Sequence, residues 1–279
     1  MAERELYVSA RRVLLDGLEA LRPHLAAVTL VGAQAIYLRV GEAEIAVAPS
    51  TTDGDLALDP GALRQTPPLQ DLMRAAGFER KPGVGGKPLV GLWARAGTGQ
   101  ADADVSVDLL MPQHVAPPAG RRAARLAGHE KGAVLKVPGL EACLVDADVM
   151  RLEALEPGDA RAFNLRVAGP AALLVAKMHK IADRTQQRDR TRDKDALDIF
   201  RLLRGTSSAE FDRRLAVLLR DARSAPPTRH ALGLFRSLFG SADGAGVAMA
   251  VRATENLMPA VEVIASLTAI AGESVFVRR

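Results

Sequence analysis

The stretch from Leu30 to Leu58 constrains this chain more than any other. The apolar run Val28 to Val31 stops at Gly32, and the apolar-rich residues 33–40 follow the glycine. After a spacer, residues 51–58 read TTDGDLAL. This order predicts a buried strand, a glycine turn, a helix and a second strand that carries two carboxylates.

The two carboxylates of this second strand, Asp53 and Asp55, are separated by one residue. Side chains alternate along a strand, so both acids point toward the same face. Like charges this close are costly unless a cation lies between them, and such oxygen ligands suit Mg²⁺. Gly32, between a strand and a helix, lets the backbone approach a phosphate at a helix N-terminus. The alternative is a plain turn, because Thr-Asp-Gly-Asp is also typical turn chemistry.

A third carboxylate stands on a later predicted strand. Residues 104–111 read DVSVDLLM, in which apolar and polar residues alternate. Asp108 therefore lies on the polar face of an otherwise apolar strand and is the candidate third acid. Asp104, on the same face, is the alternative.

A second block of charged residues lies about 120 residues after the first. A helix that begins at Pro170 carries Lys177-Met178-His179-Lys180 and leads to Arg184. The spacing lets Lys177, Lys180 and Arg184 share one face of the helix. The sequence Lys194-Asp195-Ala196-Leu197-Asp198 starts a second helix, residues 194–204, with both of its acids on one side. The composition changes near residue 168, and we interpret this change as a domain boundary without a flexible linker.

The two blocks together resemble a known superfamily. A glycine turn followed by Asp-x-Asp on the next strand resembles the DNA-polymerase-β-like nucleotidyltransferases. The later block is similar to the Lys…Lys-Asp-x-x-Asp motif of AbiEii-type nucleotidyltransferases, the toxins of type IV toxin–antitoxin systems that include the MenT group. The resemblance covers roughly residues 25–205 in order and spacing.

The resemblance implies an α/β (α+β) fold: a nucleotidyltransferase-fold mixed sheet with flanking helices and a helical C-terminal region. We predict a core domain over residues 1–168 and a helical domain over 169–279. The implied reaction is the Mg²⁺-dependent transfer of a nucleoside monophosphate from an NTP to a hydroxyl, with two metal ions. The implied acceptor is the 3′ end of tRNA, and a separate antitoxin protein is an expected partner.

The resemblance also implies roles for single residues. Asp53, Asp55 and Asp108 would be the metal ligands and catalytic acids. Gly32 and Ala33 would form the phosphate turn, with Ala33 where the family has a serine hydroxyl; that loss is worth about 0.5–1.5 kcal/mol, one hydrogen bond.

The same resemblance implies roles for the residues of the later block, 177–198. Lys177 would lie near the nucleotide phosphates, and Asp195 would orient that lysine or the nucleotide. Asp198 would assist in nucleotide binding. Without the resemblance, a surface lysine and helix-start carboxylates would explain the same residues.

Residues 184–194, RTQQRDRTRDK, hold five basic residues in eleven. By composition alone this run predicts a solvent-exposed face. The resemblance makes it a contact for triphosphate or an RNA backbone, non-specific and dependent on salt. The residues concerned are Arg184, Arg188, Arg190, Arg192 and Lys194.

Composition restricts the class of protein only loosely. The chain has 279 residues, 48% of them hydrophobic, which allows a sizeable core, and a net charge of +4, which permits a nucleic-acid partner. The single cysteine, Cys143, fits a reducing compartment. The N-terminal residues lack a signal-peptide core, and no apolar run is long enough for a membrane span. We therefore expect a cytoplasmic protein with no membrane partner.

Two further functions stay open at this stage. A small-molecule nucleotidyltransferase of the antibiotic-modifying kind would need no basic run. A non-catalytic nucleotide- or RNA-binding module would explain Ala33 and a spacer, residues 41–50, that is longer than the family's.

Local patterns also predict the remaining elements. The stretch Lys81 to Lys87 is expected to be a hairpin connection, and 44–47 an extra strand within the spacer. Residues 152–157 would be a short segment between strands. Helices are expected at 5–21, 68–76, 208–222, 227–239 and 245–270, and strands at 89–94, 134–137, 142–145 and 163–167.

Overall fold

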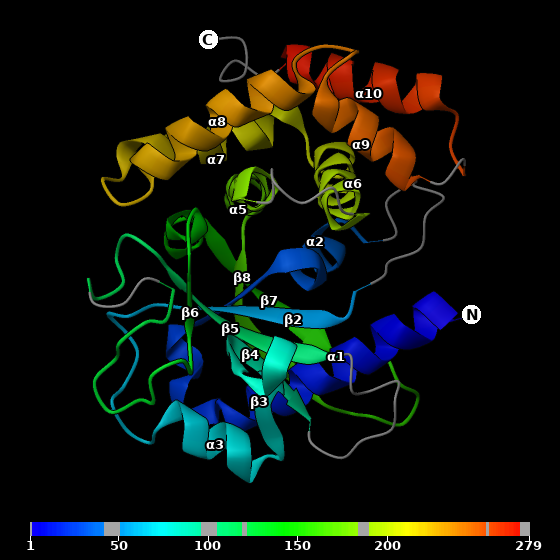
Figure 1. Cartoon of the computed structure of the whole chain (residues 1–279). Helices are drawn as coiled ribbons and strands as arrows, with labels where there is room; N and C mark the ends of the chain where they lie inside the picture. Colours follow the sequence, from blue (N-terminus) through cyan, green and yellow to red (C-terminus); the bar gives the residue numbers. More distant parts are fainter. Residues whose placement is uncertain are drawn as a thin grey trace. The chain divides into compact units, whose positions relative to one another are not determined.

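The computed structural model describes residues 2–41, 51–95, 105–118, 122–183, 190–254 and 257–273 (Figure 1). It is a mixed α/β structure with an eight-stranded sheet of parallel and antiparallel strands and flanking helices, so the predicted fold class is confirmed. The chain divides into two compact units, which are described separately below.

The first, the sheet unit, comprises Met1–Ala35, Pro49–Val137 and Ala147–Val167. The second, the helical unit, comprises Ile36–Ala48, Pro138–Asp146 and Ala168–Arg279. The predicted division into domains 1–168 and 169–279 stays a prediction.

The sheet mixes both strand directions. The order across the sheet is β3 (Phe78–Pro82), β4 (Pro88–Arg95), β5 (Ser106–Pro112), β2 (Asp53–Leu58), β1 (Val28–Val31), β8 (Ala162–Ala168) and β7 (Ala147–Glu153). β2 is parallel to β5, and β1 is parallel to β8, whereas β1–β2, β3–β4 and β4–β5 are antiparallel. A further short strand, β6 (Leu135–Val137), pairs in parallel with the second half of β5.

Helix α1 (Ala2–Ala20) packs on one face of this sheet. Glycines make the approach close: a Cβ at Gly54 would lie 2.9 Å from Leu14 Cδ1, and a Cβ at Gly17 would lie 2.9 Å from Val107 Cγ2. The face of β2 and β5 that carries Gly54 and Val107 is therefore the face that α1 covers.

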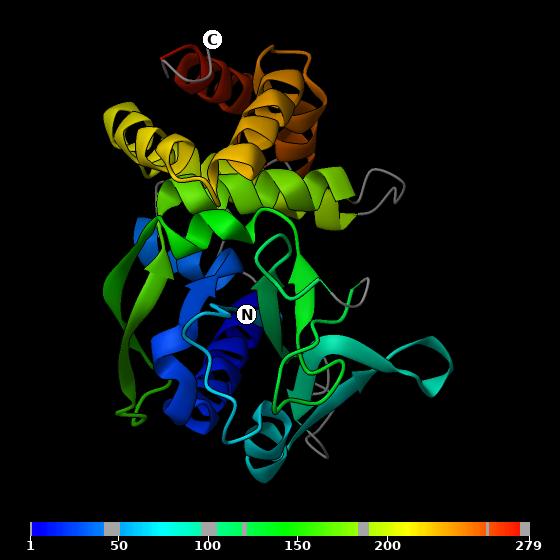
Figure 2. The ribbon, with the colours of Figure 1, turned by 90° about the vertical axis from the view of Figure 1, so that its left-hand side faces the viewer.

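The remaining elements of the sheet unit are short. The 3₁₀ helix η1 (Arg22–Ala27) follows α1, α3 (Leu69–Ala75) precedes β3, and η2 (Val84–Gly86) joins β3 to β4. The predicted hairpin connection is thus confirmed. Its tip projects away from α1 (Figure 2), and Val84 there is fully exposed.

The helical unit is built from helices that pack on one another, α6 on α9 and α5 on α8 among them. Phe235 and Phe239 stack in its core with ring centroids 5.2 Å apart. Its elements are η3 (Leu140–Leu144), α5 (Pro170–Asp183), α6 (Arg190–Arg204), α7 (Ser208–Arg220), α8 (Ala225–Phe239), α9 (Ala245–Ala253) and α10 (Ala260–Glu273). Helix α2 (Gly32–Val40) begins in the sheet unit and ends in this one.

Three local predictions are wrong. Residues 142–145 do not form a strand but lie mostly in η3, which starts after Gly139 in the left-handed region (φ 85°). The single helix over 245–270 is two helices: α9 ends at Ala253, and α10 begins at Ala260, directly after Pro259, a residue that is tolerated at a helix start. Residues 152–157 are not a separate segment throughout, because Leu152 and Glu153 belong to strand β7, which the sequence patterns missed.

Residues 44–47, the predicted extra strand, lie outside the described residues. In the part of the chain that the structure describes, every helix is too short or too polar to cross a membrane.

Candidate metal centre

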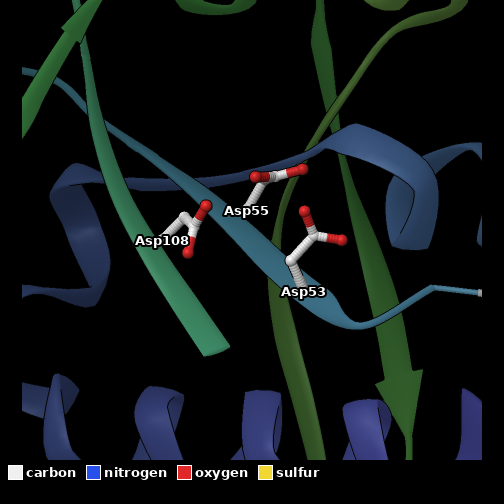
Figure 3. Close-up of side chains that lie close together, drawn as sticks. All are labelled: Asp53, Asp55 and Asp108. Atoms are coloured by element: carbon white, nitrogen blue, oxygen red, sulfur yellow. The ribbon is translucent and has the colours of Figure 1, made fainter. Parts of the chain in front are cut away.

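Three carboxylates gather on two neighbouring strands of the sheet unit. Asp53 and Asp55 stand on β2, and Asp108 stands on β5. In the parallel pairing of these strands Asp55 lies directly opposite Asp108, and Asp53 lies opposite Ser106. One oxygen from each carboxylate lies within 4.8 Å of the others (Figure 3).

The three acids share the sheet face that α1 does not cover. Strand residues alternate between faces, and Gly54 and Val107 point toward α1, so their neighbours Asp53, Asp55 and Asp108 point the other way. Asp55 is 7% exposed, and the other two acids are half-buried. The cluster is therefore partly withdrawn from water, which strengthens the repulsion between its charges.

Hydroxyl groups orient the two half-buried acids. Thr51 Oγ1 donates a hydrogen bond of 2.6 Å to Asp53 Oδ1, and Ser106 Oγ donates one of 2.9 Å to Asp108 Oδ1. Each donor stands two residues before its acceptor, so period-two alternation puts donor and acceptor on one face. These hydrogen bonds limit the rotation of each carboxylate.

The glycine turn lies against the same cluster. Gly32 follows β1, whose last residue, Val31, pairs with Asp55. Gly32 has φ 69°, and a Cβ there would lie 1.9 Å from Asp55 Oδ2, so both backbone conformation and space require glycine. The next residue, Ala33, is buried.

The donor set fits a hard cation. Three carboxylates with oxygens this close repel one another unless protonation or a cation lowers their charge. Oxygen ligands of this kind and number are those that hard divalent cations take up in proteins. Asp53, Asp55 and Asp108 can therefore hold a metal ion.

A separate cluster of charges lies within the helical unit. Lys177 Nζ, on α5, donates to Asp195 Oδ1 at 2.7 Å and to Asp198 Oδ2 at 2.6 Å, both on α6. All three residues are at most 5% exposed. Burial by itself would lower the pKa of Lys177, but the two carboxylates outweigh it and raise that pKa well above its usual value. Lys177 is therefore a charged ammonium locked between two helices.

Sequence patterns missed two members of this cluster. The hydroxyl of Tyr37, near the end of α2, donates to Asp198 Oδ1 at 3.4 Å. The guanidinium of Arg201 lies 5.2 Å from the centre of the Tyr37 ring. The three-residue spacing of Asp198 and Arg201 on one helix was the available signal, but Tyr37 is 161 residues away from Asp198.

Most of the proposed nucleic-acid contacts fall where side chains are not described. Arg184 and Arg188 lie outside the described residues, as does Asp104, the alternative third acid. Arg190 and Arg192 belong to the first turn of α6, whose side chains there are not described. Lys194 is half-buried.

Fold and site together define a mixed α/β protein with an acidic cluster on adjacent parallel strands, beside a glycine turn that opens a helix. Comparison with models of known families gives no match, and comparisons with curated proteins and with solved structures give no significant match.

Proposed function

We propose that this chain is a metal-dependent nucleotidyltransferase, which moves a nucleoside monophosphate from an NTP to a hydroxyl acceptor. The observation that carries the proposal is the geometry of the metal centre. Three carboxylates on one face of β2 and β5 adjoin a turn that opens a helix and is pressed against Asp55. A cation site beside a helix N-terminus suits a metal-bound phosphate chain.

The metal is proposed to be Mg²⁺, as two ions. Asp53, Asp55 and Asp108 would hold Mg²⁺, which would neutralise negative charge on the phosphate chain. The backbone N–H groups in the first turn of α2 would donate hydrogen bonds to phosphate oxygens, because the first four N–H groups of a helix lack partners within it.

Asp108 would accept the proton of the attacking hydroxyl. The hydroxyl oxygen then forms a bond to the α-phosphorus, the bond from that phosphorus to the bridging oxygen breaks, and pyrophosphate leaves. The bond that Ser106 donates to Asp108 Oδ1 fixes the orientation of this carboxylate. Positioning and charge neutralisation supply most of the rate enhancement in such transfers.

The finer assignments are proposals that rest on the resemblance of the motifs. They are a tRNA 3′-end acceptor, action as the toxin of a type IV toxin–antitoxin pair, and a cognate antitoxin. Lys177 and Asp195 would belong to the catalytic machinery, with Asp198 assisting in nucleotide binding. The ion pair of 2.7 Å between Lys177 and Asp195 supports a functional link between these two residues.

The decisive assay uses purified protein, Mg²⁺, each labelled NTP in turn and total tRNA. The Asp53→Asn/Asp55→Asn double variant tests the metal centre, and Asp71→Asn, an exposed acid on α3, is the matched control. Label that enters tRNA with wild type and control but not with the double variant supports the proposal. If label instead enters only small hydroxyl compounds added to the reaction, the proposal changes to a small-molecule nucleotidyltransferase. Absence of any transfer refutes the enzyme assignment.

One observation favours a second candidate, a non-catalytic nucleotide-binding module. Ala33 is buried in the turn and offers no hydroxyl to a phosphate. This candidate predicts that NTP binding survives Asp53→Asn and that neither protein turns NTP over.

A further inference from the structure

A buried arginine on α1 has no part in the mechanism above. Arg11 is 3% exposed, and its guanidinium donates three hydrogen bonds. The acceptors are Gln34 Oε1 at 2.9 Å, the backbone carbonyl oxygen of Glu153 at 2.8 Å and the hydroxyl of Tyr7 at 3.0 Å. Burial raises the pKa of Tyr7, which keeps that hydroxyl neutral. All three acceptors are thus uncharged.

A buried cation with only neutral acceptors is unusual. Buried charges in proteins are normally paired, since desolvation is expensive without an opposite charge. Among the side chains that the structure describes, no carboxylate forms an ion pair with Arg11. Burial lowers the pKa of Arg11, although the neighbouring Tyr7 opposes this. An arginine still remains charged at neutral pH, so its positive charge is left uncompensated inside the sheet unit.

This charge acts on the turn that borders the metal centre. Gln34 is the third residue of α2 and is 1% exposed, and its amide Nε2 has no partner among the described residues. The first turn of a helix already carries partial positive charge from its N–H groups. Arg11 adds a full positive charge at the same turn, whose first residue, Gly32, packs on Asp55.

Arg11 also ties this turn to the rest of the sheet unit. Through its three hydrogen bonds it joins α1, the end of β7 and the first turn of α2. The guanidinium of Arg11 and the N–H groups of the first turn of α2 both contribute positive potential there, which favours an anion.

We propose that Arg11 is a positioning residue that acts through Gln34 to hold the first turn of α2 as the receiving site for the phosphate chain of the nucleotide. Arg11 does not itself contact the phosphate. This inference rests on the proposed function and deepens it, because it assigns the source of the affinity for the phosphate chain.

The test exploits a substitution that keeps the anchor and changes only its charge. In Gln34→Glu, a carboxylate oxygen still accepts the hydrogen bond from Arg11, and the buried cation gains a partner. We expect a melting temperature equal to or higher than that of wild type. The probe is inorganic tripolyphosphate with Mg²⁺, and its affinity should fall at least about tenfold, since one added negative charge faces a polyanion at short range. Binding of Mn²⁺ alone should stay within about twofold.

Arg11→Met provides a second route if Gln34→Glu folds poorly. It removes the charge and the anchor together, and we expect at least about tenfold weaker tripolyphosphate binding and a shallower dependence of that binding on salt. Tyr7→Phe is the control: it removes one hydrogen bond of Arg11 without a change in charge, so it should affect stability but leave tripolyphosphate binding within about twofold.

The outcomes separate this inference from the proposed function. Wild-type binding of tripolyphosphate that Gln34→Glu and Arg11→Met leave unchanged overturns the role of Arg11 alone. Wild type that binds Mn²⁺ but no tripolyphosphate overturns both the inference and the nucleotidyltransferase proposal. The expected pattern, selective loss of phosphate affinity with folding and Mn²⁺ binding retained, is one that a purely structural arginine would not produce.

Discussion

Replacement of Asp108 by asparagine should stabilise the metal-free protein and strongly reduce its stabilisation by metal. Asp108 lies opposite Asp55 in the register of β2 and β5, and both belong to a cluster whose ligand oxygens lie within 4.8 Å. At that separation, two unit charges repel by about 3.5 kcal/mol at an effective dielectric of 20, and by about 0.9 kcal/mol in bulk water. Asparagine keeps an oxygen that can accept the hydrogen bond from Ser106.

The expected gain in the free energy of unfolding is smaller than the value of about 3.5 kcal/mol at a dielectric of 20. Asp108 is half-buried, so water screens part of this repulsion. We therefore expect a stabilisation of about 1–3 kcal/mol, which corresponds to a melting temperature higher by roughly 2–12 °C. The assay is thermal unfolding in EDTA and then in Mg²⁺ or Mn²⁺. A metal present at about 100 times its Kd should raise the stability of wild type by about 2.7 kcal/mol and that of Asp108→Asn far less.

Asp71→Asn, which removes an exposed acid of the same unit, is the control and should show neither effect. Two results would refute the reasoning. One is an unchanged or lower melting temperature of Asp108→Asn in EDTA. The other is an equal response of wild type and variant to metal, which would place the bound ion elsewhere.

Three further predictions concern single residues. Gly32→Ala should cost about 1–3 kcal/mol and abolish stabilisation by Mn²⁺, because φ is positive there and the new Cβ would collide with Asp55 Oδ2; a normal melting temperature with intact Mn²⁺ response would contradict this. Lys177→Met should destabilise the helical unit by about 3–5 kcal/mol, measured by chemical unfolding, because it leaves two buried carboxylates unpaired, and the added changes Asp195→Asn and Asp198→Asn should restore much of the loss. His129 accepts a hydrogen bond from the Leu69 N–H, and burial lowers its pKa from 6.5, with the charge of His24 adding to this and a bond to the Arg64 carbonyl oxygen opposing it. The neutral ring is thus favoured on folding, so its contribution to stability is complete above pH 6.5 and declines as the pH falls through the lowered pKa; melting temperatures across this range should fall less steeply for His129→Asn than for wild type.

The elements around the metal centre were predictable because their signals are local. The strand over residues 53–58, the helix after Gly32 and the hairpin at 81–87 follow from alternation, apolar periodicity and turn residues. The errors have local causes as well. Residues 142–145 are apolar enough for a strand, but Gly139 and the hydrogen bond from its N–H to Glu141 start a 3₁₀ turn instead.

The clusters of charge needed different amounts of tertiary information. That Asp53 and Asp55 share a face follows from strand geometry alone, and the same geometry put Asp108 on a polar face. The partners of the other buried polar side chains did not follow from local patterns. Tyr37 and Arg11 each bond to groups more than 20 positions away, and nothing in the local pattern marks such partners.

The sequence by itself determined the order strand, glycine turn, helix and acidic strand, because this order depends on interactions between near neighbours in the chain. Only the tertiary structure decided that β2 and β5 run parallel in a register that sets Asp55 opposite Asp108. Only the tertiary structure placed Gly32 against Asp55 and buried Arg11 where none of the described carboxylates forms an ion pair with it. These features arise from long-range strand pairing and helix packing, in which residues distant in sequence compete for the same space and the same hydrogen bonds.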